Sequence, residues 1–316
     1  MSYQLIISHN FNNIPTESFN FQQYFFNENE HLLNQGGEDC YTFYYQNLEN
    51  QSIECRFNLI IQNKIGYSPL RATFGGFEFN VGILEEELLE FISQVIHFLQ
   101  SIKIEKIEIN SYPEGYITDY QIKILQNSLQ KLNFLVKYLE QNYEIPITNK
   151  SFYESVKGST AKQLLRTYDK KGFIFQQELN PDFAFIHGFI ARSRERKNRP
   201  MTMSLEQIME HFKKFPKNFN LFSVTHTNTL VSVGVTIKIN ADILYIFYLA
   251  DDENYLKDSP TTFLLSGIYE YGKQNNFKLL DFGIATDKGI LNEGLTKFKQ
   301  SLGAKMSEKK TYILLL

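Results

Sequence analysis

Five basic residues lie close together in the second half of the chain. Arg192, Arg196 and Arg199 recur at spacings of four and three residues, and Arg194 and Lys197 lie between them. This spacing places the three arginines along one side of a helix end and its exit loop. Guanidinium groups offer paired N–H donors that suit phosphate and carboxylate oxygens, so the stretch is a candidate anion site. A solvated helix C-terminus, where the helix dipole favours cations, explains the same residues.

A second candidate is the start of a predicted helix at Ser259-Pro260-Thr261-Thr262. Ser259 suits the N-cap position, and a proline suits the first helical position. The free N–H groups of such a helix start bind anions, so Ser259, Thr261 and Thr262 are candidate cofactor-binding residues. The neighbouring Asp258 would repel a phosphate. Plain capping by Ser259 therefore remains the alternative.

A third candidate lies in the first half, where Ser68-Pro69 and Gly75-Gly76 enclose a short loop. Arg71 is the only cation of this loop. Glycines permit positive φ and a close approach of the backbone to a ligand, which makes Arg71 a candidate substrate-binding residue. A strand bulge is the alternative explanation of the two glycines.

Other kinds of catalytic site lack support in the sequence. The six histidines form no His-x-His or His-x-x-x-His pair, so we expect no metal site. The chain contains no Gly-x-Ser-x-Gly elbow, no P-loop lysine motif and no dinucleotide fingerprint. We therefore expect no tightly bound cofactor.

Composition indicates a folded protein without a broadly basic surface. The 316 residues suggest two domains, 43% of them are hydrophobic, and the net charge is −3. The two cysteines, Cys40 and Cys55, suit packed, reduced thiols. No signal-peptide pattern is present, and the apolar stretch from Leu84 to Leu99 is too polar to span a bilayer. These features predict a cytoplasmic location.

The second half follows a β-α-α-β-β-β-α-β-α-β order. A polar helix from Glu154 to Lys170 precedes its first strand. Hydrophobic periodicity, caps and turn residues then predict the following elements: a strand at 172–175, helices at 182–196 and 204–215, strands at 219–225, 230–239 and 243–249, a helix at 259–273, a strand at 279–283, a helix at 291–302 and a strand at 311–316.

The first half repeats this order. Its expected elements are a strand at 3–7, a helical region at 19–33, strands at 41–45, 54–62 and from 65, a helix at 84–102, a strand at 107–109, a helix at 119–132 and a strand at 135–143. The repeated order indicates a tandem duplication. A turn-rich stretch at 146–155 places the predicted boundary between domains 1–150 and 151–316.

The element order resembles the GNAT (Gcn5-related acyltransferase) fold. Local resemblance is carried by 67–78, by Asp281-Phe282-Gly283 with 292–295, and by 298–304, which reads Phe-Lys-Gln-Ser-Leu-Gly-Ala. Two copies in one chain are similar to the bacterial Fem-type transferases and to the double-GNAT acetyltransferases of polysaccharide synthesis. The resemblance covers nearly the whole chain. It implies an α+β or α/β fold class with two GNAT-like domains, each a mixed, mostly antiparallel sheet flanked by helices.

The resemblance also implies roles for individual residues. In this fold Tyr248 and Asp251 end the strand that splays from its neighbour, which suits Tyr248 as general acid and Asp251 as proton acceptor. Arg199 borders the acceptor cleft, and Lys299 matches the lysine that Fem-type enzymes place near a phosphorylated acceptor. Packing and solvent exposure are the alternatives for each residue.

Lys288 and Asn292 are candidate substrate-binding residues because they follow a strand end. They lie beside the carboxyl end of the strand at 279–283, where open sheets bind ligands. Asp281 lies within that strand, and its two alternative roles are those of a catalytic base and of a structural carboxylate. We expect Arg199, Lys288, Asn292 and Lys299 to converge on a cleft between the domains, with Tyr248 and Asp251 facing them.

The implied activity is transfer of an acyl or aminoacyl group to an amine or hydroxyl by direct attack. Acyl-CoA and aminoacyl-tRNA are the implied donors, and a small molecule or a cell-wall or polysaccharide precursor is the implied acceptor. Segment 255–262 lacks the glycine loop that holds the pyrophosphate of acetyl-CoA, so we expect weak binding of acetyl-CoA. A non-catalytic GNAT-like module that binds a small polar metabolite is the alternative. The sequence leaves the oligomeric state open.

Overall fold

A computed structural model describes residues 2–316 in two compact units. Unit 1 comprises the chain as far as Gln141, together with Thr286–Ile290 and Ser307–Leu316. Unit 2 comprises Asn142–Ala285 and Leu291–Met306. The expected boundary at residue 150 treats each half as continuous, whereas these units exchange segments. Strands β7 (Leu135–Pro146) and β15 (Lys305–Leu315) each begin in one unit and end in the other.

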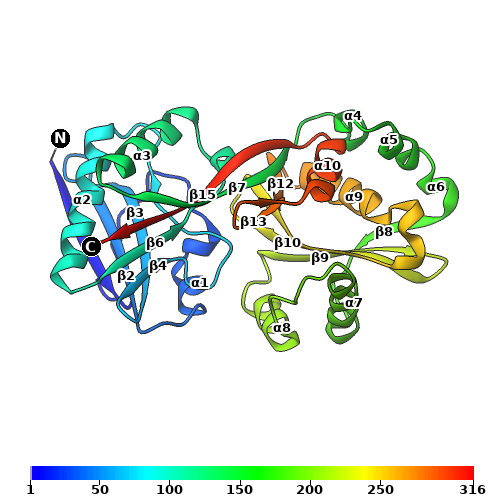
Figure 1. Ribbon diagram of the computed structural model, residues 1–316, viewed down its shortest axis with the longest axis horizontal. Coiled ribbons are helices and arrows are strands. Elements are labelled where there is room, and N and C mark those ends of the chain that lie inside the picture. Colours follow the sequence, from blue (N-terminus) through cyan, green and yellow to red (C-terminus); the bar gives the residue numbers. More distant parts are fainter. Residues whose placement is uncertain (1) are drawn as a thin grey trace. The chain divides into compact units, whose positions relative to one another are not determined.

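Unit 1 contains a mixed sheet of order β1-β2-β3-β4-β6-β15, with β5 paired to β3 (Figure 1). Neighbours are antiparallel except β4 and β6, which are parallel. The strands are β1 (Tyr3–His9), β2 (Asp39–Asn47), β3 (Ile53–Gln62), β4 (Ile65–Ser68), β5 (Glu78–Phe79) and β6 (Lys106–Asn110).

Two long helices cover one face of this sheet, and short helices lie against the other. Apolar residues of α2 (Glu85–Ser101) and α3 (Asp119–Lys131) bury Phe43 and Phe57 in the unit's core. On the opposite face, Asn58 of β3 donates to the carbonyl of Asn27 at 3.3 Å, in η1. The short helices of unit 1 are η1 (Phe25–Asn27), α1 (Asn29–Leu33) and η2 (Glu114–Tyr116).

Unit 2 repeats this strand order as β8-β9-β10-β11-β12-β7. Strands β8 to β12 take the places of β1 to β4 and β6, and β7 takes the place of β15. Only β11 and β12 are parallel neighbours. Each unit therefore has a mixed, mostly antiparallel sheet flanked by helices, as predicted. The strands are β8 (Phe173–Gln177), β9 (Phe219–His226), β10 (Thr229–Lys238), β11 (Ile243–Asp251) and β12 (Leu279–Ile284).

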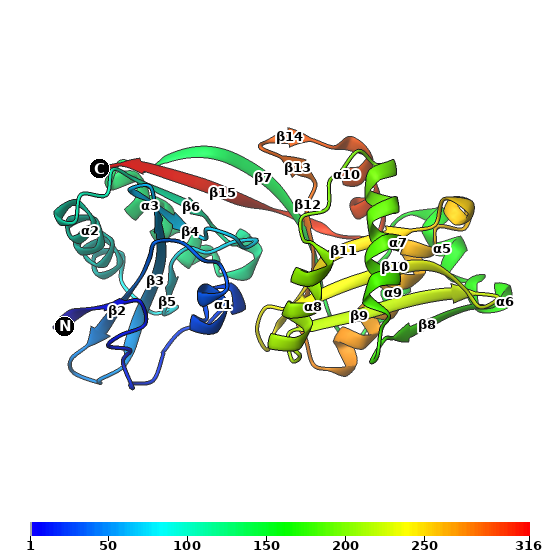
Figure 2. The same cartoon turned by 90° about the horizontal axis from the view of Figure 1, so that it is seen from below.

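In unit 2, α7 and α8 lie on one side of the sheet and α9 on the other (Figures 1 and 2). Leu264, Leu265 and Ile268 of α9 are fully buried in the core of this unit. The helices are α4 (Phe152–Ser155), α5 (Ser159–Leu165), α6 (Tyr168–Lys171), α7 (Phe183–Arg196), α8 (Leu205–Lys214), η3 (Glu253–Asp258), α9 (Pro260–Gln274) and α10 (Glu293–Ser301).

Three sequence-based expectations differ from the structure. The predicted helical region at 19–33 contains only η1 and α1, and the predicted helix at 154–170 is divided into α4, α5 and α6. A small hairpin, β13 (Thr286–Asp287) and β14 (Ile290–Leu291), precedes α10 and was not predicted. Its turn residues, Lys288 and Gly289, both have positive φ, which suits a two-residue hairpin turn.

In the described part of the chain, no helix is long and apolar enough to cross a membrane. Cys40 and Cys55 are buried free thiols. Burial raises the pKa of Cys40 to about 12, which makes its reactive thiolate scarce near neutral pH.

Candidate active site

The central feature of unit 2 is the point where β11 and β12 part. The two parallel strands pair only from Ile243 to Tyr245 of β11. Beyond Tyr245, β11 stays paired with β10 as far as Asp251, but no described strand pairs with its other edge. β12 shifts its register on β7 after Asp281, and Gly283 adopts a φ of 72°. The backbone N–H of Asp251 donates to Ser193 at 3.1 Å, and the part of this edge between Tyr245 and Asp251 is where backbone donors and acceptors are offered to a ligand.

A β-bulge lies at the start of this unpaired edge. Val235 of β10 pairs with Tyr248, and the next residue pairs with Ile246, so Phe247 has no partner on β10. A bulge redirects backbone groups and side chains, and such irregularities are frequent beside active sites. Here it reorients the backbone of β11 where β12 leaves it.

Tyr248, predicted as a general acid, is buried directly after the bulge. Its hydroxyl group forms a hydrogen bond with Thr202. The guanidinium of Arg194 lies 5.2 Å from the centre of its ring. Both contacts come from the segment around the end of α7, so Tyr248 connects that segment to β11. The sequence did not point to Thr202, because a lone threonine in a loop carries no distinctive signal.

Lys299 of α10 is 5% exposed and points toward the strand parting. Its Nζ donates to the carbonyl oxygens of Gly283 at 2.7 Å and of Ile284 at 2.8 Å. Burial lowers the pKa of Lys299 to about 7, with Asp281 opposing this effect and Arg199 adding to it. An amine with this pKa can both hold the end of β12 and exchange a proton near neutral pH.

Buried polar groups surround Asp281. Asn142 donates to Asp281 at 2.9 Å and to Glu144 at 3.0 Å, and the backbone N–H of Gly283 donates to Asp281 at 2.6 Å. Asp281 is therefore fixed by structural contacts. Sequence reasoning missed Asn142 and Glu144. A signal was present, since alternating polar residues in a strand share one face, and here that face is buried.

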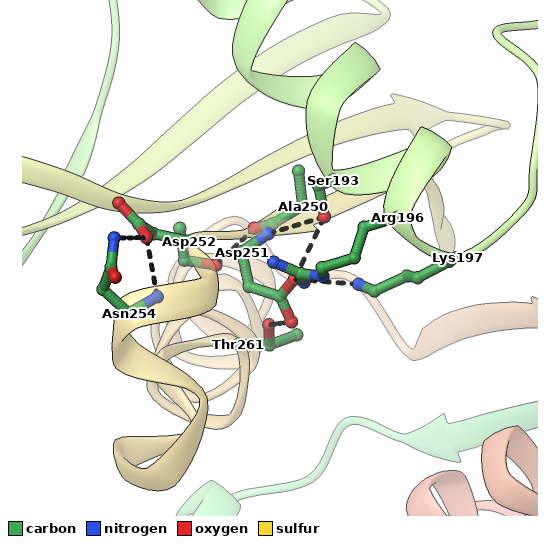
Figure 3. Close-up of polar contacts among 9 residues, drawn as sticks. Ser193, Arg196, Lys197, Ala250, Asp251, Asp252, Asn254 and Thr261 are labelled. Carbon is green, nitrogen blue, oxygen red and sulfur yellow. Dashed lines mark hydrogen bonds and ion pairs between the residues drawn. The ribbon is translucent and has the colours of Figure 1, made fainter.

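Asp251, predicted as a proton acceptor, anchors the end of α7 (Figure 3). Its carboxylate forms ion pairs with Arg196 and with Lys197, the latter at 2.9 Å. It accepts a hydrogen bond from Ser193 at 3.0 Å and one from Thr261 of α9 at 3.4 Å. Although burial acts to raise it, these partners hold the pKa of Asp251 below its ordinary value. The carboxylate is thus an ionised link between α7, β11 and α9.

We expect Asp251→Asn to lower the free energy of unfolding by about 1–2 kcal/mol at pH 7, because charge-assisted hydrogen bonds are lost at a partly solvated site. Denaturant unfolding measures this, and hydrogen exchange should show faster opening of the last turn of α7. The matched control is Asp252→Asn, since Asp252 only caps η3 through Asn254. An equal effect of the two variants would contradict the anchoring role.

The predicted cofactor-binding residues at the start of α9 are engaged with the protein itself. Ser259 occupies the N-cap position with a φ of 47°, and its side chain makes no capping bond, so the predicted capping interaction is wrong. Its hydroxyl instead bonds the hydroxyl of Thr262 at 2.9 Å, while Thr261 bonds Asp251. Tyr168 donates to the carbonyl of Ser259 at 2.8 Å. Pro260 is at the first helical position, as predicted.

The predicted substrate-binding residues are distributed over both units. Arg199 is exposed, and its charge acts on Lys299, so these two cations of unit 2 lie near one another. Asn292 caps α10 by accepting from the backbone N–H of Leu295 at 2.9 Å. Lys288, in the β13–β14 turn, and Arg71 belong to unit 1.

The loop that holds Arg71 is packed on itself. The backbone N–H of Arg71 donates to Gln35 at 3.0 Å, and its side chain is exposed. A Cβ atom on Gly75 would lie 2.6 Å from the hydroxyl of Ser68 and 2.9 Å from the nitrogen of Pro69. Close internal packing thus accounts for Gly75.

Unit 1 contains no equivalent strand parting within its described residues. All of β4 pairs with β6, from Ile65 to Ser68. Beyond it, the backbone N–H of Gly75 donates to the carbonyl of Asn110 at 2.9 Å, and Gly75 forms a parallel bridge with Ser111. The sheet position that is open in unit 2 is closed in unit 1. Among the side chains that the structure describes, no group of His, Cys, Asp and Glu is arranged to hold a metal ion.

No family model matches the sequence, and no curated protein matches it either. Solved structures do. The chain superposes on the crystal structure of FemX with a TM-score of 0.70 at 14% identity, covering 90% of each chain.

Two further structures share the fold. One is the C-terminal domain of a putative lysylphosphatidylglycerol synthetase from Agrobacterium fabrum, with a TM-score of 0.56, 10% identity, and coverage of 89% of this chain and 85% of that chain. The other is a tandem GNAT protein from the clavulanic acid biosynthesis pathway, with a TM-score of 0.51, 9% identity, and coverage of 87% and 82%. The chain therefore has a tandem GNAT, Fem-like fold, as predicted.

Proposed function

We propose that this protein is an acyltransferase that moves an acyl or aminoacyl group to an amine or hydroxyl acceptor. The parting of β11 from β12 at Tyr245, with a bulge at Phe247, is the observation that carries the proposal. It supplies unpaired backbone N–H groups in a fixed position. Donors of this kind stabilise the oxyanion that develops when a nucleophile attacks an ester or thioester carbonyl.

In the proposed reaction, the acceptor attacks the donor carbonyl directly, without a covalent enzyme intermediate. The unpaired edge of β11 polarises that carbonyl, and orientation of the two substrates lowers the barrier further. Lys299 positions the end of β12 through its two carbonyl contacts, and Arg199 binds an anionic part of the acceptor. Tyr248 protonates the leaving group, which requires its hydroxyl to exchange Thr202 for substrate. Asp251 acts as a base only if it releases Arg196 and Lys197.

Aminoacyl esters suit the site better than acetyl-CoA does. The start of α9 has no glycine loop, and its hydroxyl groups bond to one another and to Asp251. One similar structure is named for the synthesis of lysylphosphatidylglycerol, whose name includes a lysyl group. By analogy with FemX and with the putative lysylphosphatidylglycerol synthetase, we propose aminoacyl-tRNA as the donor. The proposed acceptor is a cell-wall or polysaccharide precursor in the cytoplasm.

The test is a transfer assay with matched lysine variants. The purified chain is incubated with aminoacyl-tRNA or acetyl-CoA and a panel of amine and hydroxyl acceptors, and products are identified by mass spectrometry. We expect transfer from aminoacyl-tRNA and little from acetyl-CoA. Lys299→Met should slow transfer about tenfold or more, as the loss of a charge-assisted hydrogen bond allows. Lys297→Met should not, because Lys297 is on the exposed face of α10.

Equal rates in Lys299→Met and the unmodified chain would exclude Lys299 from the reaction. A chain that binds members of the panel but transfers nothing would support the second candidate, a non-catalytic module for a small polar metabolite. The contacts that engage Asp251 and Tyr248 within the protein favour that candidate.

A further inference from the structure

Unit 1 has a cavity of about 350 Å³ that the proposed function does not use. It lies between the segment that precedes η1, the end of β5 and the start of α3, and all of its lining residues belong to unit 1. Its volume falls at the lower end of the range for small-molecule sites. Val81, which is 57% exposed, lies at its mouth.

A buried carboxylate lines this cavity. Glu78 is 1% exposed and accepts hydrogen bonds from the backbone N–H of Tyr24 and from the Nε of Arg56, each at 2.6 Å. A carboxylate has about four acceptor positions, and these contacts use two of them. Glu78 therefore retains acceptor capacity, although its side chain is 0% exposed, so a ligand reaches the carboxylate only when a neighbouring side chain of the wall moves.

A second carboxylate makes the surroundings of the cavity negative. Asn20, which lines the cavity, donates to Glu54 at 3.2 Å. The other partners of Glu54 are Ser52, Asn50 and Asn80, none of which carries a charge. Although burial acts to raise it, these hydrogen bonds hold the pKa of Glu54 below its ordinary value. Arg56 forms its ion pair with Glu78, and the described partners of Glu54 are all uncharged, so the negative charge of Glu54 is not neutralised by a direct partner.

Aromatic rings form much of the wall. Tyr24 contacts the rings of Tyr112 and Tyr116, with centroids 4.9 and 5.7 Å apart. Burial and the charge of Glu78 raise the pKa of Tyr24 and Tyr112 well above the usual value for a phenol, so both remain neutral. The negative faces of aromatic rings attract cations, and the attraction strengthens in desolvated sites.

We propose that this cavity binds the primary ammonium group of a small organic amine. The ammonium would donate to the open acceptor positions of Glu78 and contact the surrounding aromatic rings, while the alkyl part extends toward Val81. An anion is disfavoured because Glu78 is the one charged side chain among the described residues that line the cavity, and the nearby Glu54 has no cation as a hydrogen-bond partner. A primary ammonium suits the site better than a quaternary one, since only the former can donate to Glu78. This proposal is independent of the proposed acyl transfer.

Calorimetry with cadaverine, a linear diamine, tests the proposal on the intact chain. We expect saturable binding of cadaverine and none of 1,5-pentanediol, its uncharged analogue. Glu78→Gln should abolish this binding. Because that variant also alters a buried ion pair, circular dichroism must show that it is folded before its binding is interpreted.

A second pair of variants does not touch the ion pair. Val81→Lys places a cation at the mouth of the cavity and should weaken cadaverine binding about tenfold, whereas Val81→Gln, similar in length and uncharged, should retain it. The proposal is overturned if cadaverine does not bind at millimolar concentration, if pentanediol binds equally well, or if the two Val81 variants bind alike.

Discussion

Gly303→Ala is expected to destabilise unit 2 by about 3 kcal/mol or more. Gly303 follows α10 and adopts a φ of 92°, which L-residues rarely adopt. A Cβ atom would lie 2.0 Å from the carbonyl oxygen of Ser155 and 2.9 Å from its carbon. These backbone atoms cannot easily move, because the N–H groups of Lys157 and Gly158 both donate to the carbonyl of Ser301. Backbone strain and steric overlap with Ser155 therefore both lower the free energy of unfolding of this variant.

Gly172→Ala is the matched control, since Gly172 also has a positive φ, of 76°, but no atom within 4 Å of the added Cβ. It should cost only the conformational penalty, about 1 kcal/mol. Guanidinium denaturation of the two variants separates the conformational penalty of a positive φ from the cost of the steric contact with Ser155. Equal losses of unfolding free energy would show that the contact with Ser155 relaxes without cost.

The second large effect is a pH dependence of stability that arises from Lys299. An unfolded lysine releases its proton near pH 10.4, whereas Lys299 in the folded protein releases it near pH 7. Between these values the unfolded state binds more protons, so this group makes the free energy of unfolding rise with pH. From pH 7 to pH 9.5 we expect the unmodified chain to gain about 3 kcal/mol relative to Lys299→Met.

The measurement compares denaturant unfolding of the two proteins at several pH values in this window. Lys297→Met serves as the control, because its side chain is 77% exposed and it should show no such trend. Parallel stability curves for Lys299→Met and the unmodified chain would mean that Lys299 titrates as an ordinary lysine.

Elements with strong local signals were predictable from the sequence. The capping box at Ser204 starts α8, and Pro260 starts α9. Thr227 and Asn228 both have positive φ in the β9–β10 turn, as their position in a predicted hairpin requires. In each case neighbouring residues supply the cap or turn geometry, so a short window of sequence contains the information.

Features that depend on distant partners were not predictable. The segment around Tyr24 is mostly irregular because it covers a polar sheet face, where Glu78 binds its backbone. The sequence around Asp251 gives no sign that its carboxylate is paired, because its ion-pair partners at the end of α7 are more than fifty residues away. The sequence suggested that Lys299 is functional. Its two carbonyl partners, which fix its position, follow from the turn at Gly283.

The exchange of β7 and β15 has a consequence for how the protein is made. The last strand of the unit 1 sheet is β15, which pairs with β6 through Thr311–Leu315, far along the chain from the other strands of that sheet. Thr311, the first residue of β15 that pairs with β6, follows Gln141 by 311 − 141 = 170 residues. At translation rates of about 5–20 residues per second, this delay is on the order of ten to thirty seconds. Throughout this delay the edge of β6 lacks its partner, so the nascent first half must avoid aggregation until β15 has left the ribosome.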